Sequence, residues 1–232
     1  MIKSTVHKFG KWYCQKMNIK EYHSQQFRRI NERPIEFSFV FDCLKKIIPT
    51  SILDVGTGTT ALPHTMRNCG FKVTAIDNIS DYWPDGMFNR HFHVIDDDIT
   101  DTKIKDNFDA VTCISVLEHI EKFDDAVANM LSLLNPGGHL ILTCPYKETE
   151  YQKNVYKMEG ASYGQNLPFI CQMYSRKELD GWLEANNAEL VEQQFWQFWD
   201  GPYWTFGNQL PIPKQVSKDE LHQHSCMLIR KK

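Results

Sequence analysis

The sequence predicts an α/β fold, built on a doubly wound, mostly parallel sheet that helices cover on both faces. Two observations support this prediction. Near-continuous apolar runs alternate with helical segments over residues 51–144, and such strands are typical of parallel sheets buried on both faces. In the tail, strand-like runs at 189–196 and 225–230 are joined by a connection too irregular for a crossover helix. We therefore expect the final pair of strands to be antiparallel.

Two elements are predicted before the first strand. Residues 1–33 mix polar and aromatic side chains and are expected to form an N-terminal cap. Pro34 then opens a helix, because the fixed φ of proline suits the first helical turn. The apolar residues of this helix are spaced for one buried face: Ile35, Phe39, Val40, Leu44 and Ile47.

Five strands are predicted after this helix, and helical segments separate them. One of these helices runs from Phe123 to Leu134 and ends at Asn135-Pro-Gly-Gly138, which combines a helix stop with a turn. Later, Ser175-Arg-Lys-Glu178 forms a capping box for a helix that reaches about Ala185. The predicted strands are 51–55, 71–76, 91–95, 108–114 and 139–144.

Two insertions interrupt this pattern, at Tyr146–Tyr174 and Gln197–Gln223. Both leave from the edge of the sheet where its strands end, which is where open α/β sheets bind ligands, so we expect them to form the walls of a substrate site. No repeat or low-complexity linker divides the chain. We therefore expect a single domain over residues 1–232.

The composition is that of a globular protein that can bury a sizeable core, with 42% apolar and 12% aromatic residues in 232. The net charge of −3 disfavours a nucleic-acid partner, although residues 1–50 hold ten Lys or Arg against four Asp or Glu. The seven cysteines include no C-x-x-C pair, which favours a reducing compartment over a disulfide frame or a zinc site. The sequence has neither a secretory signal nor an apolar run approaching ~20 residues. We expect a cytoplasmic protein with no metal site and no membrane span.

The stretch Ser51-Ile-Leu-Asp-Val-Gly-Thr-Gly-Thr-Thr-Ala61 indicates a nucleotide-sized crevice, because a buried strand runs through a glycine turn into a helix. Glycines let the backbone approach a ligand, and the N-terminus of the helix offers free N–H groups. Asp77 follows Asp54 by 23 residues, at the end of a second strand-like run. There its carboxylate can accept hydrogen bonds from a ribose diol. Nicotinamide dinucleotides and S-adenosylmethionine are the two cofactor classes that use this geometry.

Three features favour S-adenosylmethionine. The turn Gly56-Thr-Gly58-Thr-Thr-Ala61 also fits the dinucleotide pattern G-x-G-x-x-A, but Asp54 stands two residues before it, where a dinucleotide strand is apolar. Residues 108–120 form a strand that breaks into a Glu-His turn, and 133–142 form a helix, a tight turn and a strand. The chain also lacks a Tyr-x-x-x-Lys dyad, which disfavours a short-chain dehydrogenase.

In these residues the chain resembles class I S-adenosylmethionine-dependent methyltransferases, over roughly 51–145. The resemblance implies a Rossmann-like sheet of seven strands in the order 3-2-1-4-5-7-6. It also implies S-adenosylmethionine as the methyl donor and S-adenosylhomocysteine as the product. One departure is Thr60, which replaces the family's third glycine; the N-terminus of a helix accepts threonine well.

The resemblance also implies which residues bind the cofactor. Those at its methionine end would be Asp54, Gly56, Thr57 and Gly58, with Ser115 near the methyl group. Asp77 would be the acid at its ribose, and Asn78, the next residue, is a further cofactor-binding candidate. Those at its adenine would be Asp98 and Ile99, with Asp97 as the off-by-one alternative to Asp98.

Two catalytic candidates follow the fourth and fifth strands. His119 is the candidate general base, because the ordinary pKa of histidine, near ~6.5, suits removal of a proton; alternatively, Glu118-His119 is a structural turn. Tyr146 is expected to contact the substrate, or else to be a packed aromatic ring. Metal assistance through Glu118, His119, Asp124 and Asp125 is a weaker alternative, because their spacing is not distinctive.

Two further segments leave alternatives open. Residues 195–204 are dense in aromatic side chains and could stack on a sugar or ring, cover the sheet edge or form a homodimer surface. Arg28, Arg29 and Arg33 could close over the cofactor as a lid and bind a phosphorylated acceptor, or they could belong to a solvated helix.

The expected function is O-methylation of a small polar metabolite or of a glycan- or nucleotide-linked precursor. The fourth strand ends in Ile-Ser-Val-Leu-Glu-His rather than in the Asn/Asp-Pro-Pro-Tyr motif of amide and base-nitrogen methylation. The expected partner is thus a small-molecule acceptor, anionic or sugar-like. The alternatives are a protein or RNA acceptor, a nicotinamide-dependent oxidoreductase and a non-catalytic cofactor-binding subunit.

Overall fold

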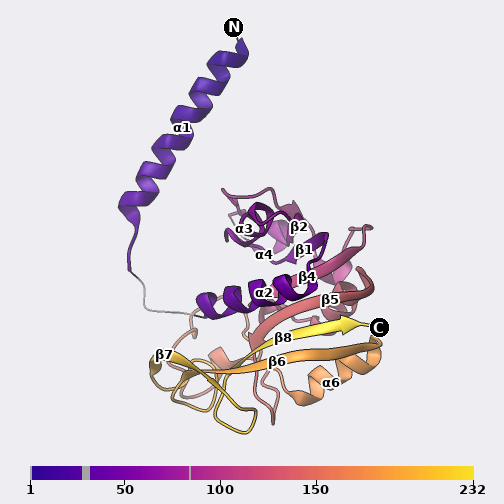
Figure 1. Ribbon diagram of the computed structural model, residues 1–232. Coiled ribbons are helices and arrows are strands. Elements are labelled where there is room, and N and C mark those ends of the chain that lie inside the picture. Colours follow the sequence, from indigo (N-terminus) through magenta and orange to yellow (C-terminus); the bar gives the residue numbers. More distant parts are fainter. Residues whose placement is uncertain (1, 28–31, 84) are drawn as a thin grey trace. The chain divides into compact units, whose positions relative to one another are not determined.

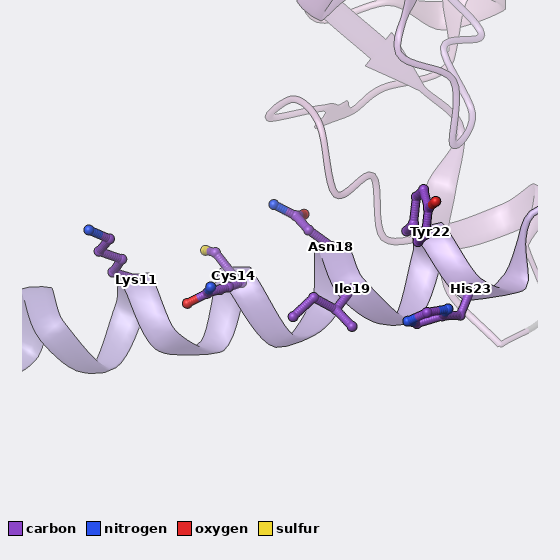
Figure 2. Close-up of a pocket in the computed structure, with 7 residues that line it drawn as sticks. Lys11, Cys14, Asn18, Ile19, Tyr22 and His23 are labelled. Carbon is purple, nitrogen blue, oxygen red and sulfur yellow. The ribbon is translucent and has the colours of Figure 1, made fainter.

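The computed structural model describes residues 2–27, 32–83 and 85–232, and the chain divides into two units, 1–31 and 32–232. The first unit contains α1 (Ile2–Ser24), a continuous helix of 23 residues (Figure 1). A shallow groove runs along this helix (Figure 2), lined by Lys11, Cys14, Gln15, Asn18, Ile19, Tyr22 and His23. All seven residues are exposed, so the groove is open helix surface rather than an enclosed site.

The predicted cap at residues 1–33 stays a prediction. Two arginines of the predicted lid, Arg28 and Arg29, lie outside the described residues. The third, Arg33, is the first residue of a helix in the second unit. It is described below with the cavity of that unit.

Eight strands in the described part of the second unit form one sheet, in the order β3-β2-β1-β4-β5-β8-β6-β7. Strands β1 to β5 are parallel, and β8 lies antiparallel between β5 and β6. This arrangement confirms the predicted α/β fold with antiparallel pairing at its end, and β7 adds an edge strand that was not predicted. The strands are β1 (Ser51–Val55), β2 (Lys72–Asp77), β3 (Ile95–Asp96), β4 (Phe108–Ile114), β5 (Leu134–Pro145), β6 (Ala188–Trp199), β7 (Gln209–Val216) and β8 (His224–Lys231).

Helices cover both faces of the sheet (Figure 1). Because successive side chains of a strand point to opposite faces, Ile52 packs with α2 and α3 whereas Leu53 packs with α5 and α6. Among the described residues, no helix combines the length and apolarity needed to cross a bilayer. The helices are α2 (Arg33–Ile47), α3 (Leu62–Asn68), α4 (Ile79–Tyr82), α5 (Phe123–Ser132) and α6 (Arg176–Ala185), with 3-10 turns η1 (Ile99–Asp101), η2 (Leu117–His119) and η3 (Val155–Lys157).

Several boundaries follow the local chemistry of the sequence. Pro34 occupies the first turn of α2 as predicted. The capping box at the start of α6 also forms, because the backbone N–H of Ser175 donates to Glu178 Oε2 at 3.1 Å. Strands β1 and β4 have the predicted bounds.

The predicted turn at Asn135-Pro-Gly-Gly138 was wrong in part, since these residues lie within β5. Pairing with β4 begins at Leu134, opposite Phe108, and the register then shifts before Ala110. Asn135 Nδ2 donates to Asp109 Oδ1 at 2.8 Å across this irregularity. The strand therefore absorbs the turn residues as a bulge instead of beginning after them.

The prediction of a strand at 91–95 was also wrong for most of its length, because β3 is only Ile95–Asp96. The backbone N–H groups of His91 and Phe92 donate to Asn89 Oδ1 at 2.8 and 3.0 Å. Hydrogen bonds from the backbone to a nearby asparagine side chain compete with a sheet ladder. Asn89 thus keeps the first part of this apolar run out of the sheet.

Candidate functional site

A cavity of about 660 Å³ lies where β1, β2 and β4 end, with loops from all three strands in its wall. The order of the sheet reverses between β1 and β4, and open α/β sheets bind ligands at such a switch point. His119 lines this cavity, and so does Arg33 from the start of α2. Nine of the predicted cofactor residues also line it: Gly56, Thr57, Gly58, Asp77, Asn78, Asp97, Asp98, Ile99 and Ser115.

The loop after β1 needs its glycines. Gly56 and Gly58 have φ values of 71° and 54°, in the left-handed region that glycine adopts without strain. A Cβ at Gly56 would lie only 2.4 Å from a methyl carbon of Val116. At Gly58 the nearest atom to such a Cβ would be 3.8 Å away, in the Trp83 ring. Gly56 therefore allows two loops of the cavity to approach each other closely. Gly58 allows only a backbone conformation that other residues rarely adopt.

Asp54 lies behind this loop and not in the cavity wall. Its carboxylate accepts hydrogen bonds from the hydroxyls of Thr57, at 2.7 Å, and Thr112, at 2.6 Å. Burial is the main reason why the pKa of Asp54 is raised to about 6, and the charge of Asp77 adds to the effect. The resemblance had implied that Asp54 contacts the methionine end of the cofactor, but the structure places its carboxylate outside the cavity wall, where it joins the glycine loop to β4.

Asp77, at the end of β2, is held on both carboxylate oxygens. Oδ2 accepts from the backbone N–H of Gly58 at 2.7 Å, and Oδ1 accepts from the indole N–H of Trp83 at 2.9 Å. Asn78 follows and donates through Nδ2 to Asp98 Oδ2 at 3.3 Å. Asp77, predicted to bind the ribose, is therefore bonded to the glycine loop. Asn78 is bonded to Asp98, which was predicted to bind the adenine.

The two candidate adenine acids differ in what they bind. Both oxygens of Asp97 accept from the backbone N–H of Lys103, at 3.1 and 3.0 Å, and the hydroxyl of Thr102 donates to Oδ2 at 2.9 Å. Asp98 accepts from the backbone N–H of Thr100 at 2.8 Å and caps the short turn that contains Ile99. Asp97 thus closes the loop after β3, while Asp98 lies between that loop and Asn78.

His119 has a defined orientation in the cavity wall. Its Nδ1 lies 2.6 Å from the carbonyl oxygen of Ile170, and because a carbonyl can only accept, Nδ1 carries the proton of the neutral ring. Nε2 is then the hydrogen-bond acceptor, 4.0 Å from Glu118 Oε1. Burial lowers the pKa of His119, and the charge of Arg33 lowers it further. The neutral ring is therefore favoured near neutral pH.

Tyr146 is not brought to the cavity. Its ring is fully buried, and it stacks on His222 with 6.0 Å between ring centroids. The hydroxyl donates to Glu148 Oε2 at 2.9 Å, and burial raises the pKa of this tyrosine. This second catalytic candidate thus lies in a packed network beyond β5, away from the other site residues.

The first predicted insertion contributes an aromatic part of the cavity wall. Phe169 lies with its ring centroid 4.7 Å from His119 and 6.0 Å from Tyr82, and Pro168 lines the cavity beside it. No residue of the second insertion, all of which is described, lines the cavity. The described residues also contain no group of three or more His, Cys, Asp or Glu placed to hold a metal ion.

Sequence reasoning missed three residues in or beneath this cavity. Trp83 and Phe169 come from segments with no recognised motif. Glu36 could have been found, because the 3.6-residue period of α2 places it on the same buried face as Phe39 and Cys43. A carboxylate on an apolar helix face needs a specific partner.

Comparison with known proteins adds to this geometry. A family model described as "Methyltransferase domain" matches residues 22–193. Over 174 residues the chain is 32% identical to the "Ubiquinone biosynthesis O-methyltransferase" of Alkalilimnicola ehrlichii, which covers 68% of this chain and 67% of that protein. The protein of the same name from Coxiella burnetii is 26% identical over 153 residues, covering 61% and 64%. The chain thus spans about two thirds of the length of these relatives.

Solved structures share the fold at lower identity. The 1,6-didemethyltoxoflavin-N1-methyltransferase of Burkholderia thailandensis, with 1,6-didemethyltoxoflavin and S-adenosylhomocysteine bound, aligns with a TM-score of 0.57 at 15% identity, covering 97% of this chain and 86% of that one. The N-methyltransferase NodS of Bradyrhizobium japonicum, with S-adenosylhomocysteine bound, aligns with a TM-score of 0.53 at 15% identity, covering 86% and 87%. At these identities the likeness concerns the fold.

Proposed function

Because this chain belongs to the methyltransferase-domain family and is an S-adenosylmethionine-dependent methyltransferase, we propose that it methylates a hydroxyl group of a small-molecule acceptor. His119 acts as the general base. The observation that carries this proposal is the contact of His119 Nδ1 with the Ile170 carbonyl, because it leaves the other ring nitrogen as an acceptor in the cavity wall.

The residues of the cavity fit the cofactor. The volume of the cavity, about 660 Å³, is typical of a small-molecule site, and the missing Cβ of Gly56 lets Val116 pack against the glycine loop. The loop at 56–58 would hold the methionine end and Asp77 the ribose. Asp98 and Ile99 would hold the adenine, because the carboxylate of Asp97 already closes its own loop. When bound, S-adenosylmethionine supplies an electrophilic methyl group on a sulfonium.

Arg33 supports the same placement. Its guanidinium lines the cavity beside the end of β4, where Nη1 donates to the carbonyl oxygen of Ile114 at 3.1 Å. A guanidinium matches the geometry of a carboxylate. Arg33 would therefore bind the carboxylate of the cofactor's methionine end, rather than act in a phosphate-binding lid.

His119 would take the proton of the acceptor hydroxyl on Nε2 while the acceptor oxygen is methylated. The lowered pKa keeps the ring neutral and able to accept at neutral pH. Positioned proton transfer of this kind contributes roughly 10²–10⁴-fold to rate. Burial raises the pKa of Glu118 to about 8, so the carboxyl that lies 4.0 Å from Nε2 is mostly protonated at neutral pH and gives the imidazolium no full counter-charge.

The aromatic wall supports an acceptor that carries a ring. Phe169 and Tyr82 present adjacent rings on the side of the cavity that holds His119, and such surfaces stack on flat or ring-shaped ligands. The relatives named for ubiquinone biosynthesis are O-methyltransferases, which agrees with a hydroxyl acceptor. An anionic or sugar-like acceptor, a homodimer and a cytoplasmic location stay predictions from the sequence.

The test is calorimetric titration of the protein with S-adenosylmethionine and, in parallel, with NAD. A panel of hydroxylated ring compounds is then assayed for release of S-adenosylhomocysteine. We expect micromolar binding of S-adenosylmethionine only, and a His119→Asn variant that binds it normally but turns over at least about 100-fold more slowly. His93→Asn, an exposed histidine outside the cavity wall, is the matched control. Preference for NAD, or unchanged turnover in His119→Asn, would refute the proposal.

A further inference from the structure

We propose that Glu36 is a positioning residue for the methyl-donor end of the cavity, where its buried carboxylate fixes Arg33 and Ser115. This inference rests on the proposed function. Glu36 comes from α2 and is 0% exposed. It does not line the cavity, but it contacts two residues that do.

Both oxygens of the Glu36 carboxylate are engaged. Oε1 accepts from the hydroxyls of Ser115, at 2.5 Å, and Thr143, at 2.7 Å. Oε2 accepts from Arg33 Nη1 at 3.0 Å. His224 of β8, also 0% exposed, places Nε2 3.2 Å from Oε1. Four groups, from α2, the turn after β4, β5 and β8, thus converge on one carboxylate under the cavity.

The charge of Glu36 is maintained by these partners. Burial by itself would raise the pKa of this carboxyl, but His224, Arg33 and the Ser115 hydroxyl lower it to about 2. An ionised and fully buried carboxylate is costly in free energy unless it is paired, and apolar side chains of similar volume often fill such a position with no loss of stability. Protein stability alone therefore does not explain why a charged residue occupies this buried position.

Ser115 shows what the carboxylate does at the site. Its φ is 50°, in the left-handed region that is strained for a serine. The backbone N–H donates to the Thr143 carbonyl oxygen at 3.1 Å, and the hydroxyl is held by Glu36. Val116, the next residue, is the one that would collide with a Cβ at Gly56. Glu36 therefore helps to hold a strained turn whose next side chain packs on the glycine loop.

Arg33 is positioned by the same carboxylate. Its Nη1 is shared between Glu36 Oε2 and the carbonyl oxygen of Ile114, which immediately precedes Ser115. Fixing a long side chain before a ligand binds reduces the entropy lost on binding. The arginine and the turn should thus be preorganised together, and both should relax when the charge of Glu36 is removed.

The test compares Glu36→Gln with the wild type in two ways. In crystal structures of the unliganded proteins, we expect the Gln variant to show Arg33 displaced from the Ile114 carbonyl or Ser115 in another conformation. In calorimetry, we expect its dissociation constant for S-adenosylhomocysteine to rise at least about tenfold, with the KM for S-adenosylmethionine rising more than kcat falls. Asp42→Asn is the matched control, because Asp42 lies on the same helix and pairs with Lys45 at the surface.

A second variant covers the case in which Glu36→Gln does not fold. Ser115→Ala removes one hydrogen bond to the carboxylate and leaves the buried charge paired with Arg33; we expect a weaker effect on cofactor affinity in the same direction. The inference is wrong if either variant leaves Arg33, the turn and the affinity as in the wild type, even when its melting temperature falls. The unliganded structures test the positioning itself, so failure of the wild type to bind S-adenosylmethionine would count against the proposed function alone.

Discussion

The carboxylate of Asp77 accepts a hydrogen bond from the backbone N–H of Gly58 at 2.7 Å, so the acid after β2 is bonded to the glycine loop after β1. The sequence had predicted both residues as cofactor contacts, but not their bond to each other. The indole N–H of Trp83 occupies the other oxygen of Asp77 at 2.9 Å. Any ligand that bonds to this carboxylate therefore meets an acceptor that two donors already hold in place.

This relationship predicts that substitutions of Asp77 and Trp83, which are bonded to each other, affect cofactor affinity differently. Asp77→Asn removes the charge and half of the acceptor capacity, so the dissociation constant for S-adenosylhomocysteine should rise at least about tenfold. Trp83→Phe keeps an aromatic ring but removes the donor that competes for Oδ1, so affinity should be unchanged or up to a few-fold higher. Calorimetry measures both. Equal weakening by the two substitutions would show that the indole N–H contributes to binding.

The two glycines of the loop should differ in their tolerance of a methyl group. An alanine at either position has a positive φ, which costs about 1–2 kcal/mol. Gly56→Ala must also displace Val116, whose methyl carbon would lie 2.4 Å from the new Cβ, for roughly 1–3 kcal/mol more. Urea unfolding should therefore show a larger loss of stability for Gly56→Ala than for Gly58→Ala. An equal loss would mean that Val116 moves away without cost.

The features predicted correctly are those that depend on neighbouring residues in the chain. A buried strand followed by a glycine turn has few conformations, and the C-terminal ends of parallel strands meet at one edge. The sequence could therefore place Gly56, Asp77 and Ser115 around one cavity. In the same way, near-continuous apolar runs predicted the bounds of β1 and β4.

What the sequence did not predict depends on contacts between distant segments. Phe169 meets His119 across 50 residues of chain, and no local pattern encodes that meeting. Tyr146 follows a strand at the correct edge, but whether its ring turns toward the cavity or away from it depends on the packing of β5 against β8. The shortening of β3 depends on a single side chain, Asn89, which binds the backbone of the run that follows it.

Asp54 should lower stability at neutral pH. Its pKa in the folded protein is raised to about 6 by burial, so the native state binds the proton more tightly than the unfolded chain does. The stabilisation that comes from this tighter proton binding is fully present below the pKa of Asp54 in the unfolded chain, near ~3.9. It is lost as the pH rises through the pKa of the folded protein, about 6. Asp54→Asn removes this cost and still offers an oxygen to the Thr57 or Thr112 hydroxyl.

Urea unfolding at two pH values checks this prediction. At pH ~8, Asp54→Asn should be more stable than the wild type by roughly 1–3 kcal/mol, and at pH ~4 the difference should be small. We expect cofactor affinity to fall in the same variant, because the loop at Thr57 loses its charged partner. A variant that is less stable than the wild type at both pH values would mean that the hydrogen bonds outweigh the burial of the charge.

The pH dependence of methyl transfer should follow the protonation state of the His119 ring. The base must be neutral to accept a proton, so kcat/KM should rise with pH through the pKa of this ring and then level off. Burial and the charge of Arg33 lower that pKa, which places the acidic limb of the profile below the ordinary value near ~6.5. Arg33→Met removes the charge and should move the limb toward higher pH, whereas His93→Asn should leave the profile unchanged. NMR titration of the His119 ring gives the pKa directly, and a limb that survives in His119→Asn would assign the proton transfer to another group.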